Sequence, residues 1–196
     1  MKKFLLLTAS VFIFGCKTQQ TTMTTSGEKT ALSKTSEGDL IGQGNVKDLF
    51  QAAFRDWFTS GYESYKPDAA TIHKLRDLTG GISVKIFMGT WCGDSKDQVP
   101  KFYKILHEAG FDKEDITLIF MDRNKTTPEK LESGLAITNV PTFIFYRTTI
   151  PGGKKGPKGD PKTKELNRIV ESPRETLEAD MLKILTNQAY KHTYAN

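Results

Sequence analysis

The chain has 196 residues, a formal net charge of +5 and a hydrophobic content of 37%. This length suits one domain, and the composition excludes both a protein with many membrane spans and a chain too polar to form a core. Its two cysteines are too few for a disulfide-stabilised scaffold or for a metal site with four thiolate ligands.

The first fifteen residues have the pattern of a secretory signal peptide. Two lysines precede the apolar run 4–14, which is too short to cross a bilayer but has the length of a signal-peptide core. The run leads to Gly15 and Cys16, a pattern that resembles the bacterial lipobox, whose cysteine is lipidated and becomes the first residue. We therefore expect residues 1–15 to be a lipoprotein signal peptide and Cys16 to anchor the protein in a bacterial cell envelope, facing the periplasm. The alternative is a buried hairpin or a core strand that begins at Phe4.

Residues 16–39 are rich in serine, threonine, glutamine and glycine. Such a segment buries too little apolar surface to offset its chain entropy, so we expect a flexible tether that precedes a domain over residues 40–196. Loss of Lys2 and Lys3 with the signal peptide lowers the net charge from +5 to +3. The remaining positive charge lies in residues 151–164, which contain five lysines and are expected to form a solvated loop. Contact of this loop with anionic lipid is the alternative, and nucleic acid is not expected because no aromatic residues accompany the lysines.

Apolar periodicity predicts the elements of the domain in chain order. We expect helices at 45–60 and 67–78, a strand at 82–88, a helix from the 89–94 turn to about 109, a strand at 116–121, a short helix at 128–133, strands at 142–146 and 166–170, and a helix at 175–187. Asn45 is the expected N-cap of the first helix. A helical crossover joins the first two strands and a hairpin joins the last two, which predicts an α/β fold with a central mixed sheet flanked by helices.

The chemistry of the chain is concentrated where the strand at 82–88 ends. Trp91, Cys92 and Gly93 follow that strand and place the cysteine at the first turn of the next helix. The unpaired amide groups and the positive dipole end of a helix N-terminus favour a thiolate. Trp91 would cover one side of the sulfur. We therefore expect Cys92 to be a nucleophile presented to solvent, and not an inert core cysteine.

At these residues the sequence resembles the thioredoxin family. Residues 91–95 align with the family's Trp-Cys-Gly-Pro-Cys motif, and Pro100 aligns with the proline that kinks its active-site helix. Val140 and Pro141 resemble the segment with the family's cis-proline, followed by a hydrophobic strand. The resemblance covers residues 68–187 and implies a thioredoxin-like fold, in which the helix at 45–60 is an N-terminal extension or the first helix of the family.

The resemblance also implies how the site residues are used. In the family the cis-proline packs beside the active-site cysteine, and the backbone around it pairs with an extended substrate segment. Cys92, Ser95 and Trp91 are accordingly the expected catalytic residues. The expected substrate-binding residues are Trp91, Gly93, Asp94, Val140 and Pro141.

Three positions depart from the family pattern. Ser95 replaces the second cysteine of the motif, Asp94 replaces its proline, and Ile86 stands where thioredoxins have a buried acid. Without a second thiol, Cys92 cannot close an internal disulfide, but it can form a mixed disulfide that a thiol of the substrate, of glutathione or of a partner protein releases. Ser95 either hydrogen-bonds the thiolate or caps the helix, as Asp94 also can, and the charge of Asp94 opposes a thiolate nearby.

The resulting hypothesis is a lipid-anchored oxidoreductase or isomerase that exchanges thiols and disulfides with envelope proteins and uses an external thiol reductant. The alternative is a thioredoxin-fold binding module without catalysis, or a structural lipoprotein in which Cys92 is vestigial. We expect no cofactor and no metal, since the sequence lacks metal-ligand spacing and a glycine-rich phosphate loop. His107 lies about 18 Å along the helix from its start, too far to act as a base for Cys92.

Overall fold

The computed structural model describes residues 32–149 and 162–195. The predicted signal peptide, Cys16, most of the predicted tether and most of the lysine-rich loop lie outside these described residues. Within them, no helix combines the length and the apolar character that a membrane span requires.

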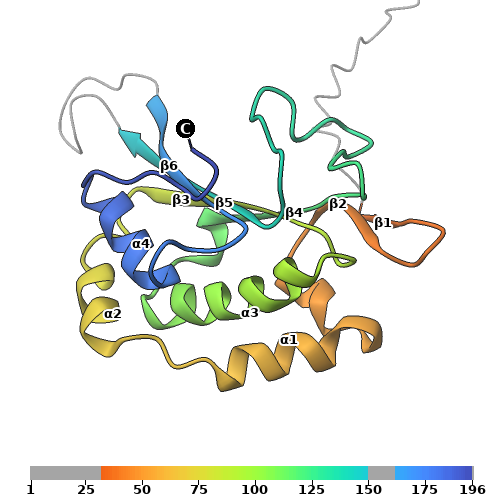
Figure 1. The fold of residues 1–196 in the computed structure, drawn as a ribbon, viewed down its shortest axis with the longest axis horizontal. Helices are drawn as coiled ribbons and strands as arrows, with labels where there is room; N and C mark the ends of the chain where they lie inside the picture. Colours follow the sequence, from red (N-terminus) through yellow and green to blue (C-terminus); the bar gives the residue numbers. More distant parts are fainter. Residues whose placement is uncertain (1–31, 150–161, 196) are drawn as a thin grey trace, which may run out of the picture.

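The described part of the chain forms one mixed sheet covered by helices (Figure 1). Its strands lie in the order β1-β2-β4-β3-β5-β6 and are β1 (Ser33–Lys34), β2 (Leu40–Gly44), β3 (Ile82–Met88), β4 (Ile116–Phe120), β5 (Thr142–Thr149) and β6 (Lys162–Val170). The helices are α1 (Ala52–Ser64), α2 (Ala69–Arg76), α3 (Gly93–Glu108) and α4 (Leu177–Leu185), with short 3-10 turns η1 (Val46–Phe50) and η2 (Lys113–Asp115).

The pairing of the central strands confirms the predicted topology. β3 runs parallel to β4, across the crossover through α3, and antiparallel to β5. β5 and β6 form the predicted antiparallel hairpin, although both strands are longer than the apolar pattern indicated. Because β3 and β4 are parallel, the segments that follow them leave the sheet at the same edge. The fold is therefore α/β and thioredoxin-like, as predicted.

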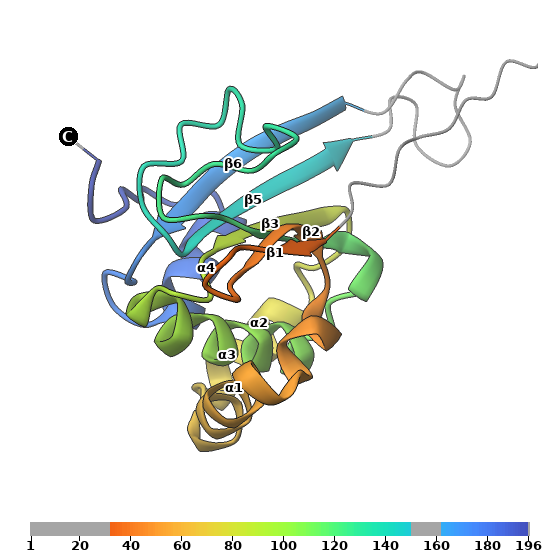
Figure 2. The same cartoon turned by 90° about the vertical axis from the view of Figure 1, so that its right-hand side faces the viewer.

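The two faces of the sheet are covered differently. All four α-helices lie on one face, as both views show, and they share one large core with the sheet (Figures 1 and 2). The other face carries a smaller core around Phe87 and Ile119. The irregular segment 121–141 covers this face and packs Leu131, Leu135 and Ile137 against it.

The prediction of a short helix at 128–133 is wrong, because these residues form turns. Thr127 and Glu132 satisfy backbone and side-chain groups within the segment: Thr127 Oγ1 accepts from the Leu131 N–H at 2.8 Å, and Glu132 Oε2 accepts from the Thr127 hydroxyl at 2.7 Å. Lys130 also has a φ of 56°, which an α-helix does not allow. These local bonds replace a helical ladder.

The N-terminal part of the domain also differs from the prediction. Asn45 is an N-cap, as predicted, but the helix is divided at Gln51 into η1 and α1. Ahead of it, the β1–β2 hairpin pairs with β4, so residues 32–39 of the predicted tether belong to the folded domain. Both residues of β1 are exposed, and a strand without an apolar face leaves no periodic signal in the sequence.

Candidate functional site around Cys92

Cys92 lies where β3 passes into α3. It is the N-cap of α3 with extended backbone (φ −88°, ψ 128°), and its N–H donates to the Gly89 carbonyl at 3.0 Å. Its thiol donates to the Val140 carbonyl oxygen, with Sγ and O 3.2 Å apart. The fold thus brings together Cys92 and the segment before Pro141, which are 48 residues apart in the sequence.

The exposure of Cys92 is much lower than the sequence predicted. The residue is only 9% exposed and packs in the smaller core with Phe87, Ile119 and Val140. The expectation of a thiol openly presented to solvent is therefore wrong. Gly93 and Asp94, which follow it in the first turn of α3, are exposed instead.

Trp91 is held in one orientation beside the cysteine. Its indole N–H donates to the Met121 carbonyl at 2.8 Å, and the Arg123 guanidinium lies 5.4 Å from the ring centroid. A side chain at Gly89 would conflict with this arrangement, since a Cβ there would lie 2.5 Å from the indole. The ring is thus fixed by contacts on the loop after β4, which is the neighbouring parallel strand.

Ser95 has neither of the roles predicted for it. The residue is fully buried, and its Oγ accepts from the Gly89 N–H at 3.2 Å. The N-cap of α3 is Cys92, without a capping bond from a side chain, and no described bond joins Ser95 to the Cys92 sulfur. Ser95 instead ties the first turn of α3 to the end of β3. Asp94 contributes a carboxylate in this first turn, where the helix dipole favours negative charge.

The segment that faces Cys92 is held from both sides. The Val140–Pro141 peptide bond is cis. On one side the Thr142 hydroxyl donates to the Asn139 carbonyl at 2.7 Å, and on the other the Glu171 N–H donates to the Pro141 carbonyl at 2.7 Å. The Asn139 amide also donates to the Glu171 carboxylate at 2.8 Å. These bonds fix the position of the carbonyl that accepts from Cys92.

A family model described as thioredoxin matches residues 51–183. The chain belongs to the thioredoxin family. Neither a curated protein nor a solved structure matches it.

Two segments outside the matched residues of this thioredoxin-family chain contact the surroundings of Cys92. The first is the β1–β2 hairpin. In it, Asp39 Oδ1 accepts from the Thr90 hydroxyl at 2.9 Å, and the Leu40 N–H donates to Thr90 Oγ1 at 3.1 Å. A polar hollow of about 300 Å³ separates this hairpin from Trp91 and the loop after β4, and Asp122 and Arg123 line it. The hairpin therefore positions the loop that carries Cys92.

The second segment is at the C-terminus. The Tyr194 hydroxyl donates to the Glu171 carboxylate, and the Thr193 hydroxyl donates to the Ser172 carbonyl at 3.2 Å. The bond to Glu171 raises the pKa of Tyr194, and the charge of Asp94 adds to this effect. Because Glu171 also bonds Asn139 and Pro141, Tyr194 lies beside the segment that faces Cys92. Its side chain is half exposed, so it is available to a bound partner.

Sequence reasoning missed Asp39, Asn139, Glu171 and Tyr194 because none of them has a local signal. They are polar residues with ordinary neighbours, and only the tertiary structure brings them to the site. Ile86, for which the resemblance implies the position of a buried acid, is fully buried in β3 and belongs to the large core. In the described ranges no cluster of histidine, cysteine, aspartate and glutamate has a geometry for metal.

Proposed function

We propose that this thioredoxin-family protein exchanges thiols and disulfides through Cys92. The observation that carries the proposal is the position of Sγ at the start of α3, 3.2 Å from the Val140 carbonyl that precedes Pro141. A sulfur at a helix N-terminus receives the electrostatic stabilisation that a thiolate needs.

The reaction takes place in two exchanges. In the first, the Cys92 thiolate attacks one sulfur of a substrate disulfide, an S–S bond forms to Cys92, and the other substrate sulfur leaves as a thiolate. In the second, a thiolate from the substrate or from a small thiol such as glutathione attacks the substrate sulfur of the mixed disulfide and releases Cys92 as a thiolate. The electrons balance because one disulfide is broken and one is formed in each exchange.

The surrounding residues provide the surface for the substrate. Gly93 has open space above it, since a Cβ there would meet no atom within 4 Å, so a substrate segment can approach the sulfur across Gly93 and Asp94. Trp91 is partly exposed and provides an apolar platform, whereas Val140 and Pro141 are buried, and Val140 contacts the sulfur through its carbonyl oxygen. Ser95 acts as a positioning residue through its bond to Gly89.

A matched pair of variants tests this function, because the chain has two cysteines. Cys16→Ser leaves Cys92 as the single thiol, and Cys92→Ser leaves Cys16. We expect the Cys16→Ser chain to accelerate the reshuffling of a protein with scrambled disulfides in glutathione buffer and to form a mixed disulfide by intact mass. The Cys92→Ser chain should do neither. Equal activity of the two variants would contradict the proposal.

We further propose that the protein is lipid-anchored through Cys16 on the periplasmic side of a bacterial envelope, where its substrates are thiol- or disulfide-containing envelope proteins and its reductant is an external thiol. The support is the sequence pattern of residues 1–16. Labelling of cells with a radioactive fatty acid should mark the wild-type chain but not Cys16→Ser. Label on both chains, or on neither, would contradict this location.

The low exposure of Cys92 favours a second candidate, a binding module that holds a partner without turnover. Cys92 is 9% exposed and its thiol donates a hydrogen bond within the fold, as a cysteine with a purely structural role would. A module predicts that Cys92→Ala keeps full partner binding and that no mixed disulfide forms. Thiol exchange predicts that covalent capture disappears with the sulfur.

A further inference from the structure

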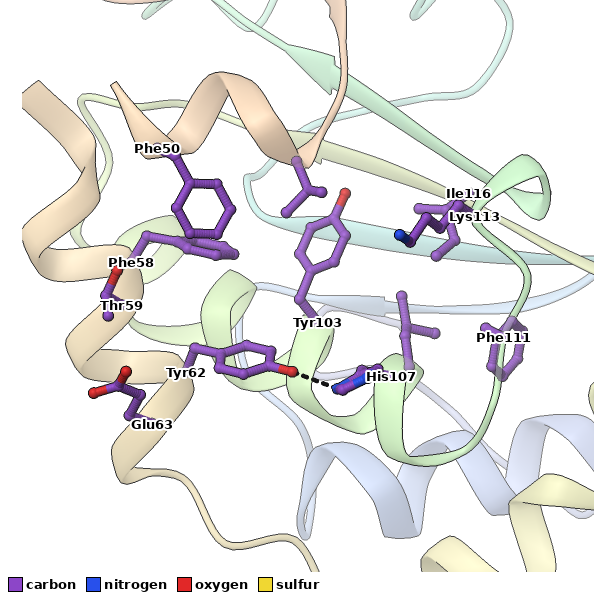
Figure 3. A pocket seen from close by; sticks show the side chains of 12 residues that line it. Phe50, Phe58, Thr59, Tyr62, Glu63, Tyr103, His107, Phe111, Lys113 and Ile116 are labelled. Carbon is purple, nitrogen blue, oxygen red and sulfur yellow. Dashed lines mark hydrogen bonds between the residues drawn. The ribbon is translucent and has the colours of Figure 1, made fainter. Parts of the chain in front are cut away.

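A separate pocket lies at the other end of α3, on the helix-covered face of the sheet. It has a volume of about 380 Å³ and lies between α1, α3, η1 and the start of β4 (Figure 3). Tyr103 and His107 belong to the second half of α3, so Tyr103 is about 16 Å along the helix from Cys92. The volume falls in the range of small-molecule sites, roughly 300–1,000 Å³. The pocket is therefore distinct from the thiol site and large enough for a ligand.

The walls of this pocket are apolar and aromatic. Phe58, Phe111 and Ile116 line it, and Phe50 stands at its edge with 50% of its surface exposed. A phenylalanine with this exposure gains free energy when an apolar group covers it. The walls thus fit a hydrocarbon body.

Tyr103 provides a polar group inside these apolar walls. Its side chain rises from α3 through the middle of the pocket, and its hydroxyl points away from the helix between Phe50 and Lys113 (Figure 3). The residue is only 9% exposed, and its hydroxyl has no hydrogen-bond partner among the residues that the structure describes. Burial raises the pKa of Tyr103, so the phenol stays neutral and can donate. The hydroxyl oxygen itself is not among the fully buried polar atoms of the described residues, so it is open to the pocket and can donate to an acceptor on a ligand.

Tyr62 differs from Tyr103, because its phenol oxygen has a hydrogen-bond partner. Its oxygen is 2.6 Å from His107 Nδ1, and the Lys104 ammonium lies 4.9 Å from its ring centroid. Tyr62 therefore lines the same pocket without an unused donor.

Lys113 gives the charge of the expected ligand. Its amino group points from η2 toward Tyr103 (Figure 3), and within residues 32–149 and 162–195 it forms no ion pair. The lining carboxylate, Glu63, belongs to α1 and lies on the far side of Tyr62 from Tyr103. The cation and the phenol donor are thus on the same side of the pocket, where they complement an anionic oxygen.

We propose that this pocket binds a monocarboxylic acid with an aliphatic body, whose carboxylate accepts from the Tyr103 hydroxyl beside the Lys113 ammonium and whose chain covers Phe50, Phe58 and Ile116. The site uses no residue of the thiol site.

Calorimetric titration of the full chain with decanoate, below its micelle concentration, tests the proposal. We expect one saturable site, and Tyr103→Phe should weaken it about tenfold because it removes a hydrogen bond to a charged group. Tyr146→Phe is the matched control, since it removes a phenol hydroxyl that has no partner among the described residues and lies outside the pocket, and it should leave the affinity unchanged. Lys113→Gln should weaken binding by a few-fold, as expected for an exposed charge pair. Decanol, which lacks the charge, should bind about tenfold more weakly than decanoate.

Three results would overturn the proposal. One is the absence of saturable binding. Another is equal affinity of the wild type and Tyr103→Phe, or of decanoate and decanol, which would indicate adsorption without recognition of the head group. The third is self-association, detected by sedimentation and weakened by Phe50→Ser, without decanoate binding, because a second copy of the chain would then cover the pocket.

Discussion

The two ends of α3 differ in how the fold uses their polar groups. At the N-terminal end, the Cys92 thiol donates to Val140, the Cys92 N–H donates to Gly89, and Ser95 accepts from Gly89. Toward the C-terminal end, the Tyr103 hydroxyl and the Lys113 ammonium have no partner in the part of the chain that the structure describes, and an apolar space remains beside them. The N-terminal end of α3 therefore holds the Cys92 sulfur in place, whereas the pocket toward the C-terminal end leaves a donor, a cation and space for a ligand.

Cys92 packs in the smaller core, whereas the pocket at the other end of α3 borders the large core, so changes at either end can be separated from changes to the whole domain. The large core includes Phe102 on α3 and Phe143 on β5, whose ring centroids are 4.1 Å apart. Mutations in this core should affect both ends. Mutations in the polar networks should affect one end only.

The largest expected effect is that of Phe102→Ala. The ring is fully buried, and its loss should lower the free energy of unfolding by about 3–5 kcal/mol. Chemical denaturation measures this change, and both thiol exchange and decanoate binding should fall with the folded fraction. Phe50→Ala, at a half-exposed ring that makes an edge contact with Phe58, is the control and should cost only about 1 kcal/mol. Similar losses for the two variants would contradict the assignment of the core.

Gly89→Ala should have the next largest effect, and only at the thiol end. The new Cβ would lie 2.5 Å from the Trp91 indole, so the ring must move, at a cost of about 1–3 kcal/mol. We expect slower mixed-disulfide formation at Cys92 and unchanged decanoate affinity. Gly93→Ala is the matched control, since its Cβ meets no atom within 4 Å. A larger loss of stability in Gly93→Ala than in Gly89→Ala would show that Trp91 does not restrict the side chain at position 89.

Asp39→Ala tests the contribution of the hairpin. It leaves the Thr90 hydroxyl without its acceptor and should cost about 1 kcal/mol. Amide hydrogen exchange should increase at residues 89–92 and stay unchanged at 103–107. Asp39→Asn, which keeps an acceptor oxygen, should have a smaller effect. Unchanged exchange at 89–92 in Asp39→Ala would exclude the hairpin from positioning this loop.

The smallest effect is expected from Tyr103→Phe in the absence of ligand. Because the hydroxyl has no partner in the described structure, stability should change by about 0.5 kcal/mol or less, and the thiol exchange rate should equal that of the wild type. Thermal unfolding and the exchange assay measure both quantities. A large loss of stability would reveal a structural role for this hydroxyl and remove the contrast between the two ends of α3.

The parts of the fold that the sequence predicted are those with local signals. The apolar runs at β3 and β4, the turn with Trp91 and Cys92, and the Asn45 cap each depend on neighbours in the chain. The β1–β2 hairpin was missed because its polar strand is defined by pairing at the sheet edge, which leaves no apolar period.

The site shows the same division between local and tertiary information. Local sequence predicted which cysteine stands at a helix N-terminus, but not that Phe87 and Ile119 cover it, because these residues belong to β3 and β4. The bonds of Glu171 to the Pro141 segment depend on a strand pairing about thirty residues away. The pocket around Tyr103 was also not predicted, since helical spacing gives no indication of whether a facing side chain fills the space.

The proposed thiol exchange requires that Cys92, although nearly covered, reacts in the folded protein. The most direct measurement is the reaction rate of the Cys16→Ser chain with an aromatic disulfide reagent, compared between the native protein and the same protein unfolded in urea. We expect one thiol to react in the native state at least as fast as in the unfolded state. A native rate many-fold below the unfolded rate, with reaction only as the chain unfolds, would show that Cys92 is a buried core residue and would contradict thiol exchange by the folded protein.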